Sequence, residues 1–276
     1  MTSFEILAAT GTPRPVVAHV PHAATAIPAD VRAGILLGDA DLARELLRVT
    51  DWHVDALWSW LPGLGVPVLV NRLSRLVVDP ERFADDAVEP MAAVGQGAVY
   101  TRTTDGRPLR APEPEPRREL LARYFDPYHE ALTSLVGERL HRFGSCLVLD
   151  CHSFATDPLP SEPDPSPGRP DVCIGTDPFH TPPALVAALR AALEAEGLRV
   201  EVDRPFAGAL VPLRWYGREP RVTSVMLEVR RGRYCDEATA EASATFGEVR
   251  AALERAVGSA LDATVRRDRK PRVDRP

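Results

Sequence analysis

Short apolar runs alternate with longer segments of helical periodicity along the chain. The apolar runs, which are typical of buried strands, occupy residues 15–20, 67–70, 75–79, 146–150, 172–175, 198–202 and 221–229. Segments with a helical spacing of apolar residues lie at 39–61, 116–143, 182–196 and 236–264. Strands that alternate with helices predict an α/β fold, in which a mixed, mostly parallel sheet is covered by helices on both faces.

Two stretches lack this patterning and are predicted to be irregular loops. Residues 83–116 have weak periodicity and many turn-forming residues, and we expect them to cross the active-site face of the sheet. Residues 157–171 contain six prolines, which disfavour regular structure. The length of 276 residues suits a single domain spanning residues 1–276, with a frayed basic tail at 265–276.

Composition narrows the classes of function. A net charge of −6 and a pI of about 5.7 do not suggest the basic face of a nucleic-acid binder. No apolar run is long enough for a membrane span, and the N-terminus lacks the pattern of a signal peptide, so we expect a cytoplasmic protein. The cysteines are scattered and are predicted to be buried free thiols: Cys146, Cys151, Cys173 and Cys235.

Candidate chemistry gathers where apolar runs end, and ligands of open α/β sheets collect beyond the carboxyl ends of the strands. The polar residues at these ends are His22, Asp79, His152 and Glu228. Two histidines with a carboxylate form the usual protein ligand set of catalytic zinc, which leaves a fourth position open. The pattern therefore predicts a divalent metal ion such as Zn²⁺, held by His22 and His152.

The third ligand and the supporting residues have alternatives. Asp51 lies in the predicted helix 39–61 and is the favoured third ligand, although an exposed helix carboxylate fits the same pattern. His53 competes with it but would point to a different face of that helix. Asp150 and Ser153, which flank His152, are predicted to support the site around the ligands.

The roles of the remaining charged residues are also open at this point. Glu228 is either a general base or the partner of Arg230 or Arg231 in a salt bridge. Arginine forks bind carboxylates, which suggests a small acidic substrate. The residues predicted to bind it are Arg75, Asp79, Arg82 and Arg214, although arginines in an arginine-rich chain are often plain surface charge. We expect a small-molecule partner, and the pattern specifies no oligomeric state.

Several of these segments, taken in order, resemble those of the N-formylglutamate amidohydrolases. They are Val20-Pro21-His22, Thr50-Asp51-Trp52, Ser74-Arg75-Leu76-Val77-Val78-Asp79 with Arg82, Leu149-Asp150-Cys151-His152-Ser153-Phe154, Pro205-Phe206-Ala207-Gly208, and Glu228-Val229-Arg230-Arg231 with Tyr234. The resemblance covers roughly residues 15–260. It implies a phosphorylase/hydrolase-like fold akin to zinc carboxypeptidases, a zinc site on His22, Asp51 and His152, and Glu228 as the general base.

The substrate implied by the resemblance is the formyl amide of glutamate, from one route of histidine catabolism. The chain departs from the family pattern in its loops: Ala23-Ala24 replaces Ser-Gly, Asp79-Pro80-Glu81-Arg82 replaces Asp-Leu-Asn-Arg, and Gly208-Ala209 replaces a double glycine. A second hypothesis is therefore an amidohydrolase for another N-acyl amino acid or small peptide-like amide. A third is a non-catalytic binding protein, which would be expected to have lost a ligand or the base.

Overall fold

The computed structural model describes residues 2–268, and its centre is one seven-stranded sheet. The strands are β1 (Phe4–Leu7), β2 (Val16–Val20), β3 (Val68–Asn71), β4 (Cys146–Phe154), β5 (Val172–Gly175), β6 (Val200–Val202) and β7 (Val222–Arg230). Their order is β1-β3-β2-β4-β7-β5-β6. The pairs β3–β2, β2–β4, β4–β7 and β5–β6 are parallel, while β1 and β5 run antiparallel to β3 and β7. The predicted mixed, mostly parallel sheet is confirmed.

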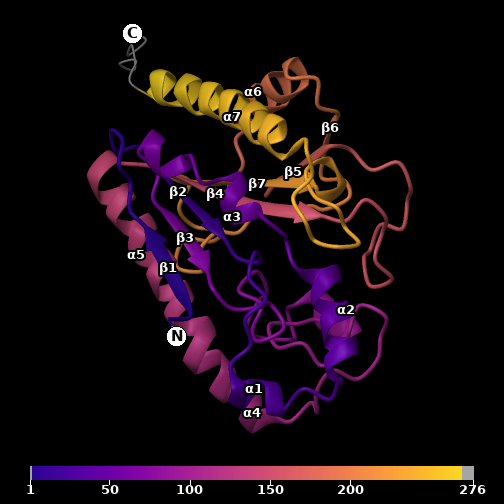
Figure 1. Cartoon of the computed structure of the whole chain (residues 1–276). Helices are drawn as coiled ribbons and strands as arrows, with labels where there is room; N and C mark the ends of the chain where they lie inside the picture. Colours follow the sequence, from indigo (N-terminus) through magenta and orange to yellow (C-terminus); the bar gives the residue numbers. More distant parts are fainter. Residues whose placement is uncertain (1, 269–276) are drawn as a thin grey trace.

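Helices cover both faces of this sheet (Figure 1). On one face, α5 (Asp126–Phe143) packs Leu132 and Val136 against Val17 and Val148. The neighbouring strand residues point to the opposite face, as the period of a strand requires. There they meet α3 (Val54–Leu57), α6 (Pro183–Ala195) and α7 (Phe246–Asp268) in the largest apolar cluster.

A third group of elements lies below the sheet in Figure 1, away from α6 and α7. It contains α1 (Ala29–Ala33), α2 (Asp39–Val49), η2 (Pro90–Val94) and α4 (Pro114–Leu120). Most of the segment predicted to be irregular at 83–116 belongs to this group, and before α4 its regular structure is limited to η2. The segment 157–171 has neither helix nor strand. The remaining short helices are η1 (Leu61–Leu64), η3 (Leu121–Phe125) and η4 (Arg231–Arg233).

The helix predicted at 39–61 is broken, which corrects the expected setting of Asp51. Helix α2 ends at Val49, and α3 begins only at Val54, after His53 adopts the left-handed backbone conformation with φ of 61°. The backbone N–H of Asp51 donates to the carbonyl of His22 instead of continuing the helix. A contact with a distant segment thus overrides local helical periodicity.

Two other predicted elements are also wrong, and two elements were not expected. Residues 75–79 form turns rather than a strand, because their apolar side chains fill two small clusters outside the sheet. The last helix begins at Phe246, since the carboxylate of Asp236 accepts the N–H groups of Ala238 and Thr239 in a local turn. Strand β1 and helix α1 were not predicted.

The long helix predicted at 116–143 is continuous from Pro114 through α4, η3 and α5. A π-helical turn precedes Pro127, whose missing N–H interrupts the usual hydrogen-bond ladder. Helix α7 extends to Asp268, and residues 269–276 of the predicted tail lie outside the described residues. All four cysteines are buried and free, as predicted. Within residues 2–268, none of the helices has the length and apolarity of a membrane span.

Candidate active site

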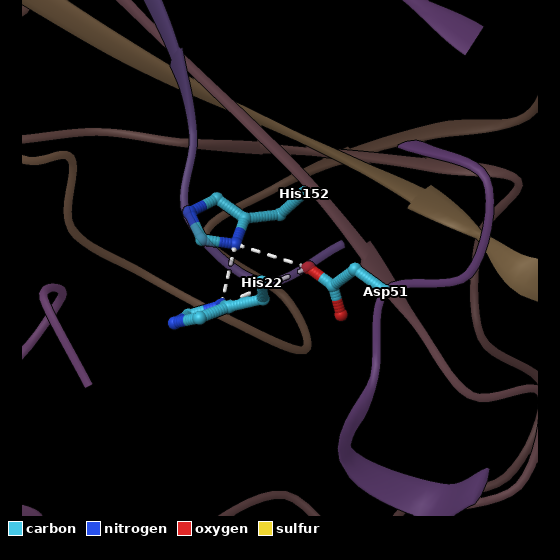
Figure 2. A group of neighbouring side chains, drawn as sticks. All are labelled: His22, Asp51 and His152. Carbon is cyan, nitrogen blue, oxygen red and sulfur yellow. Dashed lines mark hydrogen bonds and ion pairs between the residues drawn. The ribbon is translucent and has the colours of Figure 1, made fainter. Parts of the chain in front are cut away.

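Three predicted metal ligands converge on one point (Figure 2). His22 Nδ1 lies 3.2 Å from His152 Nδ1, and Asp51 Oδ2 lies 3.3 Å from His152 Nδ1 and 3.8 Å from His22 Nδ1. All three side chains are at least 95% buried. Metal–ligand bonds of about 2.0–2.1 Å in a tetrahedral zinc site place the ligand atoms about 3.3 Å apart. The donor set and its spacing therefore fit a divalent metal ion.

Each of these ligands is positioned by a different kind of local structure. His152 lies within β4, whose pairing with β7 extends to Phe154, so the strand is longer than predicted. His22 follows β2 by two residues. Asp51 lies in the break between α2 and α3, where its Oδ2 accepts the backbone N–H of Ser153 at 3.1 Å. Asp51 is thus buried at the site and is not an exposed helix carboxylate.

Carboxylates contact the other nitrogen of each histidine. His22 Nε2 lies 2.7 Å from Asp79 Oδ1, and His152 Nε2 lies 2.6 Å from Asp150 Oδ1. A proton on each Nε2 leaves the lone pair of each Nδ1 free, and these two lone pairs then face each other across 3.2 Å. A cation between them relieves that repulsion. Carboxylates behind ligating histidines are the usual way in which a protein orients a metal site.

The neighbouring histidines keep the carboxylate of Asp51 charged. Burial alone would raise the pKa of Asp51, but the two neighbouring histidines reverse this and hold the pKa below its usual range. Burial likewise opposes the charge of His152, yet Asp150 raises the pKa of this imidazole well above its usual value. The cluster therefore favours positive charge at its centre.

Glu228 faces the same site from the neighbouring strand. It is in register with His152 in the parallel β4–β7 pair, is 8% exposed, and its Oε2 has no hydrogen-bond partner. Burial raises its pKa to about 8. The alternative salt bridges are not formed, because Arg230 pairs with Asp171 and Arg231 donates to the carbonyl of Arg48.

Two of the three predicted substrate-binding arginines lie in the site. Arg75 donates to Asp79 Oδ2 through Nε at 3.1 Å and Nη2 at 2.7 Å, and Tyr100 donates to the same oxygen at 2.7 Å. Arg82 Nε is 3.7 Å from that oxygen and has no hydrogen-bond partner. Burial opposes the charge of Asp79, but Arg75, His22 and Arg82 together hold its pKa well below the usual range.

Other sequence candidates lie elsewhere. Arg214 is exposed, stacks its guanidinium 5.6 Å from the centre of the Trp215 ring, and does not line the site cavity. His53 Nε2 contacts the carbonyl of Ala240 at 2.7 Å, which excludes it as a ligand in this arrangement. Ser153 contributes its backbone N–H to Asp51, as described above, rather than its hydroxyl.

Some residues of the site were not predicted. His19 contacts Asp150, and Glu81 contacts His152. Arg231 lies 3.9 Å from Asp51, and Gln96 has a buried Nε2 without a hydrogen-bond partner. His19 gave a usable signal, because a histidine inside a fully apolar strand needs a polar partner. Arg231 and Gln96 gave none, since their positions depend on contacts between distant segments.

Most of these residues line a cavity of about 590 Å³. The polar part of its lining includes the candidate metal ligands, Glu228, Arg75 and Arg82. The apolar part includes Phe83, Phe206, Leu213 and the ring of Tyr216. The cavity therefore combines a metal-type centre, a buried carboxylate and cationic groups with an apolar wall.

Comparison with known proteins identifies the family of the chain. The model of the family described as N-formylglutamate amidohydrolase matches residues 14–235. The chain belongs to this family. It is an amidohydrolase, and the resemblance noted from the sequence segments is confirmed.

Named members of the N-formylglutamate amidohydrolase family are similar over most of the chain. An N-formylglutamate deformylase of Pseudomonas aeruginosa is 34% identical over 81% of this chain and 83% of its own length. One from Pseudomonas putida is 29% identical over 81% of this chain and 82% of its own length. The crystal structure of an N-formylglutamate amidohydrolase from Ralstonia eutropha has the same fold, with a TM-score of 0.81, 24% identity, and coverage of 96% of this chain and 99% of that one.

Proposed function

We propose that this amidohydrolase cleaves the formyl amide of N-formylglutamate in a metal-dependent reaction. The convergence of His22, Asp51 and His152 beside the buried Glu228 is the observation that carries the proposal. The curated relatives named N-formylglutamate deformylase support this choice of substrate. The third hypothesis, a non-catalytic binding protein, is disfavoured because all four of these residues are present and face one cavity.

The proposed metal ion is Zn²⁺, bound by His22 Nδ1, Asp51 Oδ2 and His152 Nδ1. When bound there it would supply a Lewis acid for the amide carbonyl and lower the pKa of water toward about 7. The chain's own contribution is orientation: Asp79 and Asp150 hold the imidazoles so that both Nδ1 atoms face the same point. The N–H of Ser153 holds the carboxylate of Asp51 in the same way.

Glu228 is the proposed general base. Its unpartnered Oε2 can accept a proton from the attacking water. The water oxygen forms a bond to the formyl carbon, the C–N bond breaks, and the proton passes from Glu228 to the leaving nitrogen. Formate and glutamate are the products. A carboxyl whose pKa lies near neutrality suits both halves of this transfer, because it can take up and release the same proton.

The substrate carboxylates are proposed to bind at the polar side of the cavity. Arg82 has an Nε donor without a partner, and Arg75 is held beside it by Asp79. A guanidinium can bind a carboxylate through two parallel hydrogen bonds. We place the carboxylates of an acidic amino acid against these two arginines. Arg214, which lies outside the cavity, has no part in the proposal.

One observation favours a second candidate substrate class. The cavity of about 590 Å³ lies within the size range of sites for larger, drug-sized ligands, and its apolar wall includes Phe206, Leu213 and Tyr216. A different N-acyl amino acid, or a small peptide-like amide with an apolar group, would fill that side. The metal centre and the base would serve both substrates alike.

A panel of amides distinguishes the two candidates. The zinc-loaded protein is assayed with the N-formyl, N-acetyl and N-succinyl derivatives of glutamate, and with the N-formyl derivatives of leucine and phenylalanine. The first candidate predicts that formylglutamate has the highest kcat/KM. A higher kcat/KM for an apolar derivative supports the second candidate, and no hydrolysis of any amide contradicts both. The buried free cysteines support a cytoplasmic location, which belongs to this proposal.

A further inference from the structure

A second group of potential ligands lies behind His152, on the side away from the first centre. His19 Nε2 lies 3.0 Å from Asp150 Oδ1 and 3.2 Å from Glu81 Oε1. His152 Nε2 lies 2.6 Å and 3.7 Å from the same two oxygens. The side chains of His19 and Asp150 are fully buried, and that of Glu81 is 10% exposed. His19 Nε2, Glu81 Oε1 and Asp150 Oδ1, from three segments of the chain, therefore lie close enough together to hold a metal ion.

The contacts among these atoms are close, yet they lack the geometry of hydrogen bonds. His19 Nε2, Glu81 Oε1 and Asp150 Oδ1 all remain without a hydrogen-bond partner although each lies within 3.2 Å of another member of the group. The ring nitrogen of His19 is thus not aligned with either oxygen. This is the arrangement expected when lone pairs are directed at an ion between the three atoms rather than at one another.

The distances between these atoms also fit a bound metal ion. Bonds of about 2.1 Å place neighbouring ligands about 3.0 Å apart in an octahedral site and about 3.4 Å apart in a tetrahedral one. The distances of 3.0 and 3.2 Å from His19 Nε2 fall in this range. One imidazole with two carboxylates suits Zn²⁺ or Mn²⁺. Glu81 and Asp150 also line the cavity, so an ion can reach the group from solvent.

The charges around Asp150 and Glu81 also favour a bound cation. Among the residues that the structure describes, no lysine or arginine forms an ion pair with Asp150 or Glu81. Within that part of the chain, the basic side chains that contact the two carboxylates are His19 and His152. Two largely buried carboxylates therefore lie together without a permanently charged side chain beside them, and buried charge is costly without a counter-charge.

We propose that His19, Glu81 and Asp150 bind a second divalent metal ion. Asp150 then has two roles, because it ligates this ion and its Oδ1 lies 2.6 Å from Nε2 of His152, a ligand of the first centre. The two centres are separated by the imidazole of His152.

Metal counting on the full-length protein tests the proposal without reference to the substrate. The wild type is saturated with Zn²⁺ or with Mn²⁺ and then desalted. It should carry two equivalents of metal per chain, as measured by inductively coupled plasma mass spectrometry. Glu81→Ala should carry one. Glu162→Ala is the matched control, because this carboxylate also lines the cavity and is similarly buried, but it pairs with Arg169. It should retain two equivalents.

Ligand variants of the first centre separate the two sites. Asp51→Ala should lose one equivalent and keep the one held by His19, Glu81 and Asp150. Thermal unfolding of each variant checks that it is folded, and the wild-type count stands even if Glu81→Ala does not fold. A wild type that binds a single equivalent with either metal overturns the second site, as does a folded Glu81→Ala with two. A single equivalent that is lost in Asp51→Ala overturns the second site while supporting the first.

Discussion

The strand-borne and loop-borne halves of the active site are built in different ways. His152, Asp150 and Glu228 lie on β4 and β7, where register in the sheet sets their relative positions. The loop-borne half, which includes His22, Asp51 and Asp79, depends on single long-range contacts such as the hydrogen bond from the N–H of Asp51 to the carbonyl of His22. In this candidate metal site, the α/β sheet supplies one half as rigid scaffold and loops supply the rest.

The largest expected effect comes from removing one ligand from each half. His152→Ala and Asp51→Ala should each lower kcat/KM for N-formylglutamate by at least about 1,000-fold, because the proposed metal ion would supply most of the activation of carbonyl and water. Zinc content and turnover are measured on the same samples. Suppose that Asp51→Ala keeps the zinc content and the activity of the wild type while His152→Ala loses them. Asp51 in the loop half would then contribute no ligand, and the division of the ligands between strands and loops would be contradicted.

The carboxylates behind the histidines should give a smaller effect. Asp150→Asn on the strand and Asp79→Asn on the loop should each weaken zinc affinity by about 10- to 100-fold, the usual range for such supporting residues. Asp79 also holds Arg75, so only Asp79→Asn should raise KM as well. Competition with a chelator gives the affinities and steady-state kinetics give KM. Equal KM values in the two variants would contradict the role given to Asp79.

The strand-borne half of the site can be predicted from the sequence more fully than the loop-borne half. The apolar runs at 146–150 and 221–229 located β4 and β7, and with them His152 and Glu228, because buried parallel strands are recognisable by their composition. Their register could not be read from the sequence, since strand pairing joins segments more than 70 residues apart along the chain.

The loop half was predicted with less success. Asp51 was chosen correctly as a residue that reaches the site, but its helix was not, because helical periodicity does not reveal a break stabilised by His22. The apolar run 75–79 has the pattern of a strand, but its side chains pack outside the sheet. Short apolar runs are ambiguous in this way. Arg214 was selected by residue type alone, and the structure leaves it exposed outside the cavity.

Substrate binding offers a test within the loop half. Arg82→Gln should raise KM for N-formylglutamate by about 10- to 100-fold, because a hydrogen bond to a charged group contributes about 1.5–3 kcal/mol. Arg214→Gln is the control and should leave KM unchanged, since Arg214 stacks on Trp215 at the surface. Steady-state kinetics give the KM of both variants. An unchanged KM in Arg82→Gln would place the substrate carboxylates elsewhere.

The smallest predicted effect is on the pH dependence of kcat/KM. Glu228 in the strand half should contribute to it, and Asp79 in the loop half should not. Glu228 acts as a base only in its carboxylate form, so kcat/KM should fall as the pH is lowered through its pKa. Burial raises that pKa from 4.5 to about 8, and a bound cation lowers it again, so the acidic limb should lie between these values. Asp79 adds no limb there, because its pKa is held well below the usual range. A flat profile from about pH 4 to about pH 9 would argue against Glu228 as the base.

The most direct test is the turnover of zinc-loaded Glu228→Gln. This substitution preserves size and removes the proton acceptor, while His22, Asp51 and His152 remain in place. We expect the variant to carry as much zinc as the wild type and its kcat for N-formylglutamate to fall by at least about 100-fold, the lower end of the effect of a general base. Wild-type kcat in a variant with full zinc content would contradict it.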